Sequence, residues 1–262
     1  MSKETIHILW TGGWDSTYRV VELSMRDVII QPIYVIDTNR RSVPYELKAM
    51  DTIVKLLESK EKTRAKFLPA KMINIADIPE NPEITAAYQV FKEEADMGSQ
   101  HDWLARLAKE YPGMECCIEK ALGEHAPIRQ SIQRHGRLID TGDGYIVDKE
   151  NCSHELALVL GNLKLPIFEK TEMDMLKDIQ RWGYEDVMQE IWFCHNPING
   201  KPCGFCSPCS TKMTSNMAVL LTADARKRYK RMKLIEKTFG GKAASIYKRA
   251  ARKYGKIKGR LL

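Results

Sequence analysis

Short apolar runs alternate with stretches of helical periodicity over the first sixty residues. Residues 5–10 and 28–36 are rich in apolar, β-branched and aromatic side chains, which predicts two buried strands. Each run is followed by apolar positions at helical spacing, which predicts helices over residues 15–25 and 45–59. Because a strand–helix–strand–helix order favours right-handed crossovers, we expect a parallel sheet covered by helices.

After residue 60 the pattern of hydrophobic positions is less regular, but it still predicts both strands and helices. It predicts a third strand over residues 67–75 and further short strands over 115–118 and 137–140. Helical spacing predicts a helix over 83–108, broken at Gly98, and shorter ones over 174–182 and 185–190. Two more helices are predicted over 211–239 and 242–254, joined at Gly240 and Gly241. The expected fold is α/β, with a five-strand parallel sheet followed by a C-terminal helical region.

Charge is distributed unevenly along the 262 residues, whose formal net charge is +7. Residues 226–262 hold 15 basic residues and one acid, Glu236, so the body before them carries a net charge of −7. Such a basic segment suits nucleic acid, another anionic partner, or an acidic patch on the protein's own body. A protein partner and a homodimer are also compatible with the composition.

The same basic segment contains an apolar stripe. Six residues recur at helical spacing: Ala243, Ile246, Tyr247, Ala250, Ala251 and Tyr254. Three interpretations stay open: a packed surface helix, a basic face for an anionic partner, and a helix lying on a membrane surface. The stripe lacks the Trp, Phe and Leu that typically face a membrane, which disfavours the third.

The chain shows neither the basic start and apolar run of a signal peptide nor an apolar run of about 18 residues for a membrane span. We therefore expect a soluble, cytoplasmic protein.

A loop of glycines and hydroxyl residues separates the first predicted strand from the first predicted helix. Its residues are Thr11, Gly12, Gly13, Trp14, Asp15, Ser16 and Thr17. The glycines let the backbone approach a ligand, and the helix start offers N–H groups that stabilise a phosphate. The hydroxyl groups add donors, and Asp15 would either cap the helix or hold a cation such as Mg²⁺. A plain turn with Asp15 as N-cap is the alternative.

Four of the seven cysteines fall within sixteen residues. They are Cys194, Cys203, Cys206 and Cys209, in the spacing C-x8-C-x2-C-x2-C. Each C-x-x-C places two thiolates on one turn, and four thiolates complete a structural Zn²⁺ site that stabilises the surrounding loops. A redox pair and an iron–sulfur cluster are the alternatives. The other three cysteines, Cys116, Cys117 and Cys152, are predicted to be core thiols.

The loop sequence TGGWDST resembles the SGGxDS/T loop of the PP-loop ATP pyrophosphatases, with Thr11 in place of the usual Ser. That family splits ATP between the α- and β-phosphates, transfers AMP to a carboxyl or carbonyl oxygen, and holds pyrophosphate in this loop. The resemblance implies that residues 11–17 bind the nucleotide, that Asp15 and Ser16 are catalytic, and that Asp15 helps to hold Mg²⁺.

Together with the cysteine spacing, this loop resembles the 7-cyano-7-deazaguanine (preQ0) synthase family. Residues 33–50 are similar to its second strand, its D-x-G-Q-R-type turn and its E-x-x-A helix, matching at Asp37, Arg40, Glu46 and Ala49. Residues 165–183 are similar to its proline-plus-lysine segment, matching at Pro166 and Lys170. Trp192 and Cys194 match its Trp-x-Cys entry to the zinc loop. The resemblance covers residues 5–215 in blocks, but the family's G-Y-P-D-C-R element has no clean counterpart.

This resemblance implies a fold of the adenine nucleotide alpha hydrolase (PP-loop, Rossmann-like) type. It implies a nucleotide-binding domain over residues 1–170 and a helical zinc-binding region over 171–225, before a basic extension over 226–262. Lys170 would be a third catalytic residue that neutralises phosphate charge, and Asp37 and Arg40 would contact the nucleotide. Lys170 and Arg40 are also interpretable as solvated surface residues. For Asp143, on a Gly-Asp-Gly turn, a site role and a plain turn stay open.

The implied activity is an ATP-dependent ligase that forms AMP and pyrophosphate, with structural Zn²⁺ and with Mg²⁺ and ATP at the loop. It would adenylate a 7-carboxy-7-deazaguanine-like carboxylate and aminate it to an amide or nitrile. The alternatives are a ligase that joins a deazapurine to a protein in phage defence, a tRNA-modifying enzyme of the thiolase type, and a non-catalytic binding protein.

Overall fold

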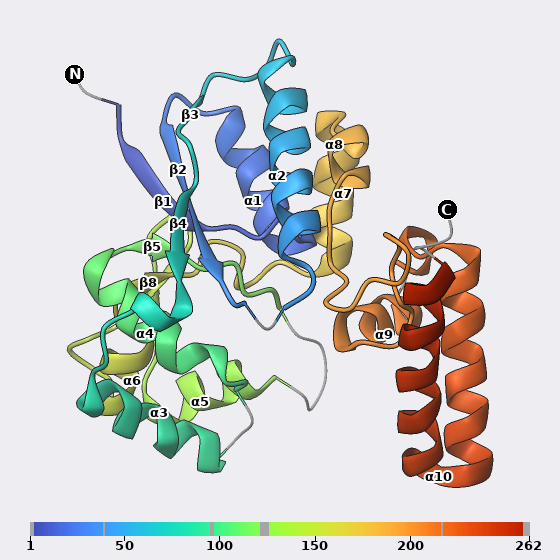
Figure 1. The fold of residues 1–262 in the computed structure, drawn as a ribbon. Helices are drawn as coiled ribbons and strands as arrows, with labels where there is room; N and C mark the ends of the chain where they lie inside the picture. Colours follow the sequence, from blue (N-terminus) through green and yellow to red (C-terminus); the bar gives the residue numbers. More distant parts are fainter. Residues whose placement is uncertain (1–2, 39, 95–96, 121–125, 216, 259–262) are drawn as a thin grey trace. The chain divides into compact units, whose positions relative to one another are not determined.

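The structure is a computed structural model and describes residues 3–38, 40–94, 97–120, 126–215 and 217–258, without the side chains of 254–258. It contains two compact units, coloured along the chain in Figure 1. The first comprises Met1–Asp37 and Thr52–Glu190, and the second comprises Thr38–Asp51 and Ile191–Leu262. A compact unit is not yet an independently folding domain, so the predicted domain limits at residues 170 and 225 stay predictions.

A parallel sheet forms the centre of the first unit. Its strands are β1 (Thr5–Leu9), β2 (Ile29–Ile36), β3 (Lys66–Phe67), β4 (Lys71–Asn74), β5 (Met114–Glu115) and β8 (Leu163–Lys164). The order is β3-β2-β1-β5-β8, and β4 pairs with β2 further along the same edge as β3. Because β3 and β4 share one edge position, the sheet has five positions, and the predicted five-strand parallel sheet is confirmed.

Pro32 explains why the edge strand is split in two. The carbonyl of Ile30 accepts a hydrogen bond from the N–H of Leu68, whereas the carbonyl of Ile33 accepts one from Trp10 of the other neighbour. Pro32 alternates with Ile33, so its missing N–H faces the edge strand. There the side chain of Gln31 donates to the carbonyl of Pro69 instead, at 2.8 Å. The predicted strand over 67–75 is therefore interrupted between β3 and β4.

Helices cover both faces of the sheet (Figure 1). On one face, α1 (Trp14–Ser24) contacts α7 (Glu172–Trp182) and α8 (Glu185–Gln189). On the other, α3 (Pro82–Glu94), α4 (Gln100–Glu110) and α5 (Pro127–His135) pack with α6 (His154–Leu160). A cluster of fully buried residues joins these helices to the sheet, among them Ile33, Phe91, Leu104 and Leu156. The α2 helix (Val43–Glu58) runs from the second unit into the first.

Several sequence-based predictions in the first unit are corrected. The predicted strand over 137–140 does not join the parallel sheet; β6 (Leu138–Asp140) pairs with β7 (Tyr145–Val147) in a separate antiparallel hairpin. The predicted strand over 115–118 is only the two residues of β5, and β8, α5 and α6 were not predicted. A short 3-10 helix, η1 (Ile75–Asp77), follows β4.

In the second unit, the predicted helix over 211–239 is wrong. The chain forms α9 (Ser207–Thr214), then η2 (Ala218–Leu220), and only then α10 (Ala223–Lys258). The new helix begins there because the hydroxyl of Thr222 accepts a hydrogen bond from the N–H of Ala225, as an N-cap residue does. Non-helical backbone at Gly240 divides α10 into two limbs that lie side by side (Figure 1). The predicted joint at Gly240 is confirmed.

The apolar stripe of the second limb of α10 is narrower than predicted. Ala244, Tyr247 and Ala251 pack into the core of the second unit with Met232 of the first limb. Ile246 is 65% exposed, so its predicted place in the stripe is wrong, and Ala250 is also exposed. The buried residues differ from the predicted stripe because the first limb covers only a narrow part of the surface of the second limb. The side chain of Tyr254 lies outside the described residues. Among the helices that the structure describes, none has the length and apolar content needed to cross a membrane.

Candidate functional site: a glycine loop and a four-cysteine centre

The glycine loop leaves β1 at the carboxyl edge of the sheet. Gly12 has a φ of 69°, in the left-handed region that favours glycine, and Gly13 is the N-cap of α1. Asp15 therefore lies inside the first turn of α1, and the alternative in which it caps the helix is wrong. The first N–H groups of a helix have no partners within it, and ligands of open α/β sheets bind at this edge. The backbone thus matches an anion site.

The hydroxyl residues of the loop differ in accessibility. Thr11, Ser16 and Asp15 are half-buried, so they can reach a ligand. Thr17 is fully buried, and its hydroxyl accepts a hydrogen bond of 3.0 Å from the indole of Trp10. This bond ties α1 to the residue that follows β1. The nucleotide-binding and catalytic roles assigned to residues 11–17 stay predictions.

Two cysteines lie next to this loop. β5 pairs with β1 at Ile8 and Glu115, so the chain that leaves β5 runs beside the loop that leaves β1. Burial and, to a smaller extent, the Asp15 carboxylate raise the pKa of Cys116 to about 12. Burial also raises the pKa of Cys117, with Glu115 and Asp15 adding to it. Both are neutral thiols near Asp15, and Cys117 is only half-buried. The predicted strand over 115–118 could not indicate that these thiols lie next to the glycine loop, because the pairing of β5 with β1 joins residues far apart in sequence.

A buried ion pair connects α1 to β5. Arg19 donates from Nε and Nη2 to the two carboxylate oxygens of Glu115, at 2.8 and 2.7 Å. The two side chains are 2% and 1% exposed. Arg19 also donates to Glu22 at 2.6 Å and to Asp143 at 3.0 Å. The helix that follows the glycine loop is thereby held against the neighbouring strand.

Asp143 belongs to the same network. It accepts from Arg26 at 2.7 Å and from Lys164 of β8 at 2.9 Å, in addition to Arg19. Burial alone would raise the pKa of Asp143, but these cations hold it well below its usual range. The structure therefore places Asp143 in an ion network that joins the β6–β7 turn to α1 and β8.

Lys170 lies beside α1 as well. Its ammonium group donates to Asp178 of α7 at 2.8 Å, and Tyr18 of α1 donates to the same carboxylate oxygen at 2.7 Å. Burial would raise the pKa of Asp178, but the bonds from Lys170 and Tyr18 lower it. Lys170 also lines an open surface hollow of about 470 Å³ together with Asp174, Lys177 and Arg181. Its phosphate-neutralising role stays a prediction.

The two remaining predicted nucleotide contacts, Asp37 and Arg40, belong to different units of the structure. Asp37 follows the last residue of β2 at the carboxyl edge of the sheet and is half-buried. Arg40 belongs to the second unit, where its guanidinium donates to Glu46 of α2 at 2.9 Å. Glu46 is 3% exposed. Arg40 therefore fixes the start of α2, and two of the four residues that matched the motif in this segment contact each other.

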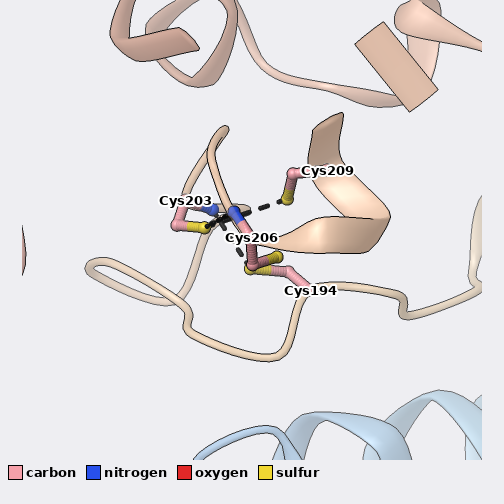
Figure 2. Close-up of side chains that lie close together, drawn as sticks. All are labelled: Cys194, Cys203, Cys206 and Cys209. Carbon is pink, nitrogen blue, oxygen red and sulfur yellow. Dashed lines mark hydrogen bonds between the residues drawn. The ribbon is translucent and has the colours of Figure 1, made fainter. Parts of the chain in front are cut away.

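Figure 2 shows the four cysteines gathered around one point. The Sγ atoms of Cys194, Cys203, Cys206 and Cys209 are buried and lie within 4.8 Å of one another. The pairs Cys194–Cys206 and Cys203–Cys209 are 3.9 and 4.0 Å apart. A tetrahedral ion with metal–sulfur distances of about 2.3 Å requires sulfur–sulfur distances of about 3.8 Å. The group could hold one metal ion.

Backbone donors and neighbouring side chains support this centre. The N–H groups of Cys203 and Cys206 donate to the Sγ atoms of Cys194 and Cys203, at 3.1 and 3.3 Å, which favours the thiolate form. Arg228 of α10 donates to the carbonyls of Cys203 and Pro202, both at 2.8 Å. Gly204, at a φ of 89°, lies so close to the carbonyl of Ala225 that a Cβ would overlap it. The loop is therefore fastened to the first limb of α10.

The centre is also linked to α2 within the second unit. The indole of Trp192 donates to the carbonyl of Cys194 at 2.8 Å. The same indole stacks on Tyr45 of α2, with ring centroids 4.6 Å apart and an angle of 18°. The segment that follows β2 is thus packed on the cysteine loop. The sequence placed Trp192 at this loop but could not indicate its partner on α2.

Comparisons with known proteins add little to this description. No protein-family model and no curated protein matches the sequence. Among solved structures, the chain is similar to the U34-tRNA thiolase NcsA from Methanococcus maripaludis with its [4Fe-4S] cluster. The identity is 13%, the TM-score is 0.38, and the match covers 98% of this chain and 74% of that one. A similarity at this level carries no conclusion about activity. The chain is an α/β protein with a five-strand parallel sheet and a four-cysteine cluster before a long helix.

Proposed function

We propose that this protein is an ATP-dependent ligase that cleaves ATP between the α- and β-phosphates, with residues 11–17 as its pyrophosphate site. The observation that carries the proposal is the sequence TGGWDST at the turn from β1 into α1, at the carboxyl edge of a parallel sheet. Its left-handed Gly12 and the positive end of the α1 dipole, at the start of that helix, suit a phosphate group.

The groups of the loop would have different roles in binding the pyrophosphate and the metal ion. Backbone N–H groups and the hydroxyls of Thr11 and Ser16 would bind the departing pyrophosphate, where preorganised donors stabilise developing negative charge. The half-buried carboxylate of Asp15 suits Mg²⁺, which binds oxygen ligands. Mg²⁺ would neutralise charge on the phosphates when bound. Arg19 would act indirectly, because its pair with Glu115 fixes the helix that presents these groups.

Three further residues are proposed contacts. Lys170 would bring positive charge to the phosphates from its place beside Tyr18, 5.6 Å from the centre of that ring. Asp37 would contact the nucleotide from the end of β2, since ligands bind outside the carboxyl ends of parallel strands. Arg40 is proposed as a nucleotide contact held in place by Glu46.

The proposed acceptor is the carboxylate of a 7-carboxy-7-deazaguanine-like compound, on the strength of the sequence resemblance. Its oxygen would attack the α-phosphate, releasing pyrophosphate and forming an acyl-adenylate. Ammonia would then displace AMP to give an amide. In a second cycle the amide oxygen would be adenylated and leave with AMP, giving the nitrile. Protection of the acyl-adenylate from water would be part of the protein's task.

We further propose that the four cysteines hold a structural zinc ion. The short sulfur–sulfur distances support a single tetrahedral ion, whereas a four-iron cluster gives each thiolate its own iron and holds the sulfurs farther apart. Four thiolates would fill the coordination sphere, so the ion would stabilise the loop and leave the chemistry to other residues. A colourless protein with one zinc per chain is expected; a brown protein with iron would contradict this assignment.

The test is to incubate the zinc-loaded protein with ATP, Mg²⁺, ammonia and 7-carboxy-7-deazaguanine, and to follow AMP and the product mass. Asp15→Asn should abolish product formation while leaving the circular dichroism spectrum unchanged. Asp224→Asn is the matched control, because Asp224 also lies in the first turn of a helix. No product with a folded, zinc-loaded protein would contradict this acceptor. AMP that forms only when tRNA or a protein is added would favour one of those acceptors instead.

A further inference from the structure

The α10 hairpin carries a large and uneven charge. Its residues, Ala223–Lys258, include 14 Lys and Arg against two acids, Asp224 and Glu236, a net charge of +12. Both limbs contribute, and a bend at Gly240 brings them side by side (Figure 1). Like charges at this density repel one another, so the hairpin is stabilised when an anionic partner covers it.

Some of these basic side chains contact other residues of the second unit. Arg228 binds the carbonyls of the cysteine loop, Arg226 donates to the carbonyl of Ala218, and Lys233 pairs with Glu236. Arg252 lies over the ring of Phe205. Seven exposed basic residues form no ion pair with any described residue: Lys227, Lys230, Arg231, Lys237, Lys242, Arg249 and Lys253. These seven residues are called the basic face below.

The apolar side of the hairpin is already occupied. Met232, Ala244, Tyr247 and Ala251 pack into the core of the second unit. A helix that lies on a membrane inserts its continuous apolar face, and that face is not available here. What remains outside is the basic face and a few separate apolar side chains, which disfavours a membrane as the partner.

An aromatic side chain is exposed next to the bend between the two limbs. Phe239, next to the bend, is 73% exposed, between Lys237 and Lys242 in sequence. Surfaces that bind single-stranded nucleic acid combine positive charge along the backbone with exposed aromatic rings on which bases stack. An acidic protein surface would use the charge but would give Phe239 no specific role.

We propose that the basic face and Phe239 bind single-stranded nucleic acid, with the lysines and arginines on phosphates and the ring of Phe239 stacked on a base. The inference does not depend on the proposed ligase activity. It gives the second unit a recognition surface built on the same helix that fastens the cysteine loop.

The test is fluorescence anisotropy with a labelled 20-nucleotide oligouridylate and the matching oligothymidylate, at 50 to 200 mM KCl. If all seven side chains contact phosphates, the log–log slope of affinity against salt is about −5, at about 0.7 per contact. The variant Lys227→Gln, Lys230→Gln, Lys237→Gln, Lys242→Gln should lower the magnitude of this slope by about 2 to 3. The matched control replaces four exposed lysines of the first unit by Gln: Lys55, Lys66, Lys92 and Lys109. This control should bind like the wild type.

The variant Phe239→Ala tests the contribution of base stacking to the affinity separately from that of charge. It should weaken binding about fivefold or more at every salt concentration while leaving the slope unchanged, since a stacked base contributes about 1–3 kcal/mol. Val219→Ala, at a residue that is 77% exposed outside α10, is its control and should have no effect. Equal affinity for RNA and DNA would indicate backbone recognition, and preference for RNA would indicate contact with the 2′-hydroxyl.

Several results would overturn the inference. These are salt-independent or undetectable binding by the wild type, an equal loss in the two four-lysine variants, and tighter binding to vesicles of phosphatidylserine and phosphatidylcholine than to either oligonucleotide. AMP formation should be unchanged in the hairpin variants. Failure of nucleic-acid binding is thus distinguishable from failure of the ligase activity.

Discussion

The pair between Arg19 and Glu115 offers a sharp test of how α1 is fixed to the sheet. Glu115→Gln keeps the size of the side chain but removes its charge, leaving Arg19 charged and almost fully buried. Breaking one side of a buried pair costs about 3–5 kcal/mol. Arg19 keeps its contacts with Glu22 and Asp143, so we expect the lower end, about 3 kcal/mol of unfolding free energy.

The measurement is urea unfolding of the zinc-loaded chain at pH 7, followed by far-ultraviolet circular dichroism. Glu22→Gln is the control: its side chain is 27% exposed, so its loss should cost about 1 kcal/mol or less. Replacing both partners with Arg19→Met and Glu115→Leu should recover much of the loss, because neither buried charge of the pair then remains, and Glu22 is partly exposed to water. A cost for Glu115→Gln no larger than that for Glu22→Gln would refute the reasoning.

Three further outcomes follow from the contacts described. Metal analysis should find one zinc per chain, and the variant Cys206→Ser should have a much lower zinc content. Arg228→Met should weaken zinc binding about tenfold in a chelator competition, because the cysteine loop loses two hydrogen bonds to α10. Asp178 has a folded-state pKa below its usual value near 3.9, so its pairs add stability above about pH 4 that is lost as the pH falls through the folded pKa. The stability difference between wild type and Asp178→Asn should therefore shrink from pH 6 to pH 3; a constant difference would contradict this assignment.

The parts that could be predicted from the sequence are those with a local signal. β1, α1 and β2 follow from apolar periodicity and the glycines between them. The cysteine centre follows from its spacing, since four cysteines this close can meet at one ion with little help from the rest of the chain. Gly240 was predictable as the joint of α10 because a pair of glycines interrupts an otherwise helical pattern.

The rest depends on contacts between distant residues. Glu115 lies 96 positions from Arg19, and its strand has two residues, too few for a period. The sequence predicts a strand over 115–118 but not its short extent in β5, and it does not predict β8, because two-residue strands are defined by their pairing. The stack of Tyr45 on Trp192 and the approach of Cys116 and Cys117 to Asp15 likewise arise only when the chain has folded. The predicted wide stripe on α10 was wrong at Ile246 because periodicity does not reveal how much of a face its partner covers.

The most direct measurement is the fate of ATP labelled at the α-phosphate, separated after incubation with the zinc-loaded protein, Mg²⁺ and an acceptor mixture of carboxylate and ammonia. We predict label in AMP, with pyrophosphate in equal amount, and no turnover by Asp15→Asn. Label in ADP, or AMP formation by Asp15→Asn at the wild-type rate, would contradict the assignment of residues 11–17 as a pyrophosphate site.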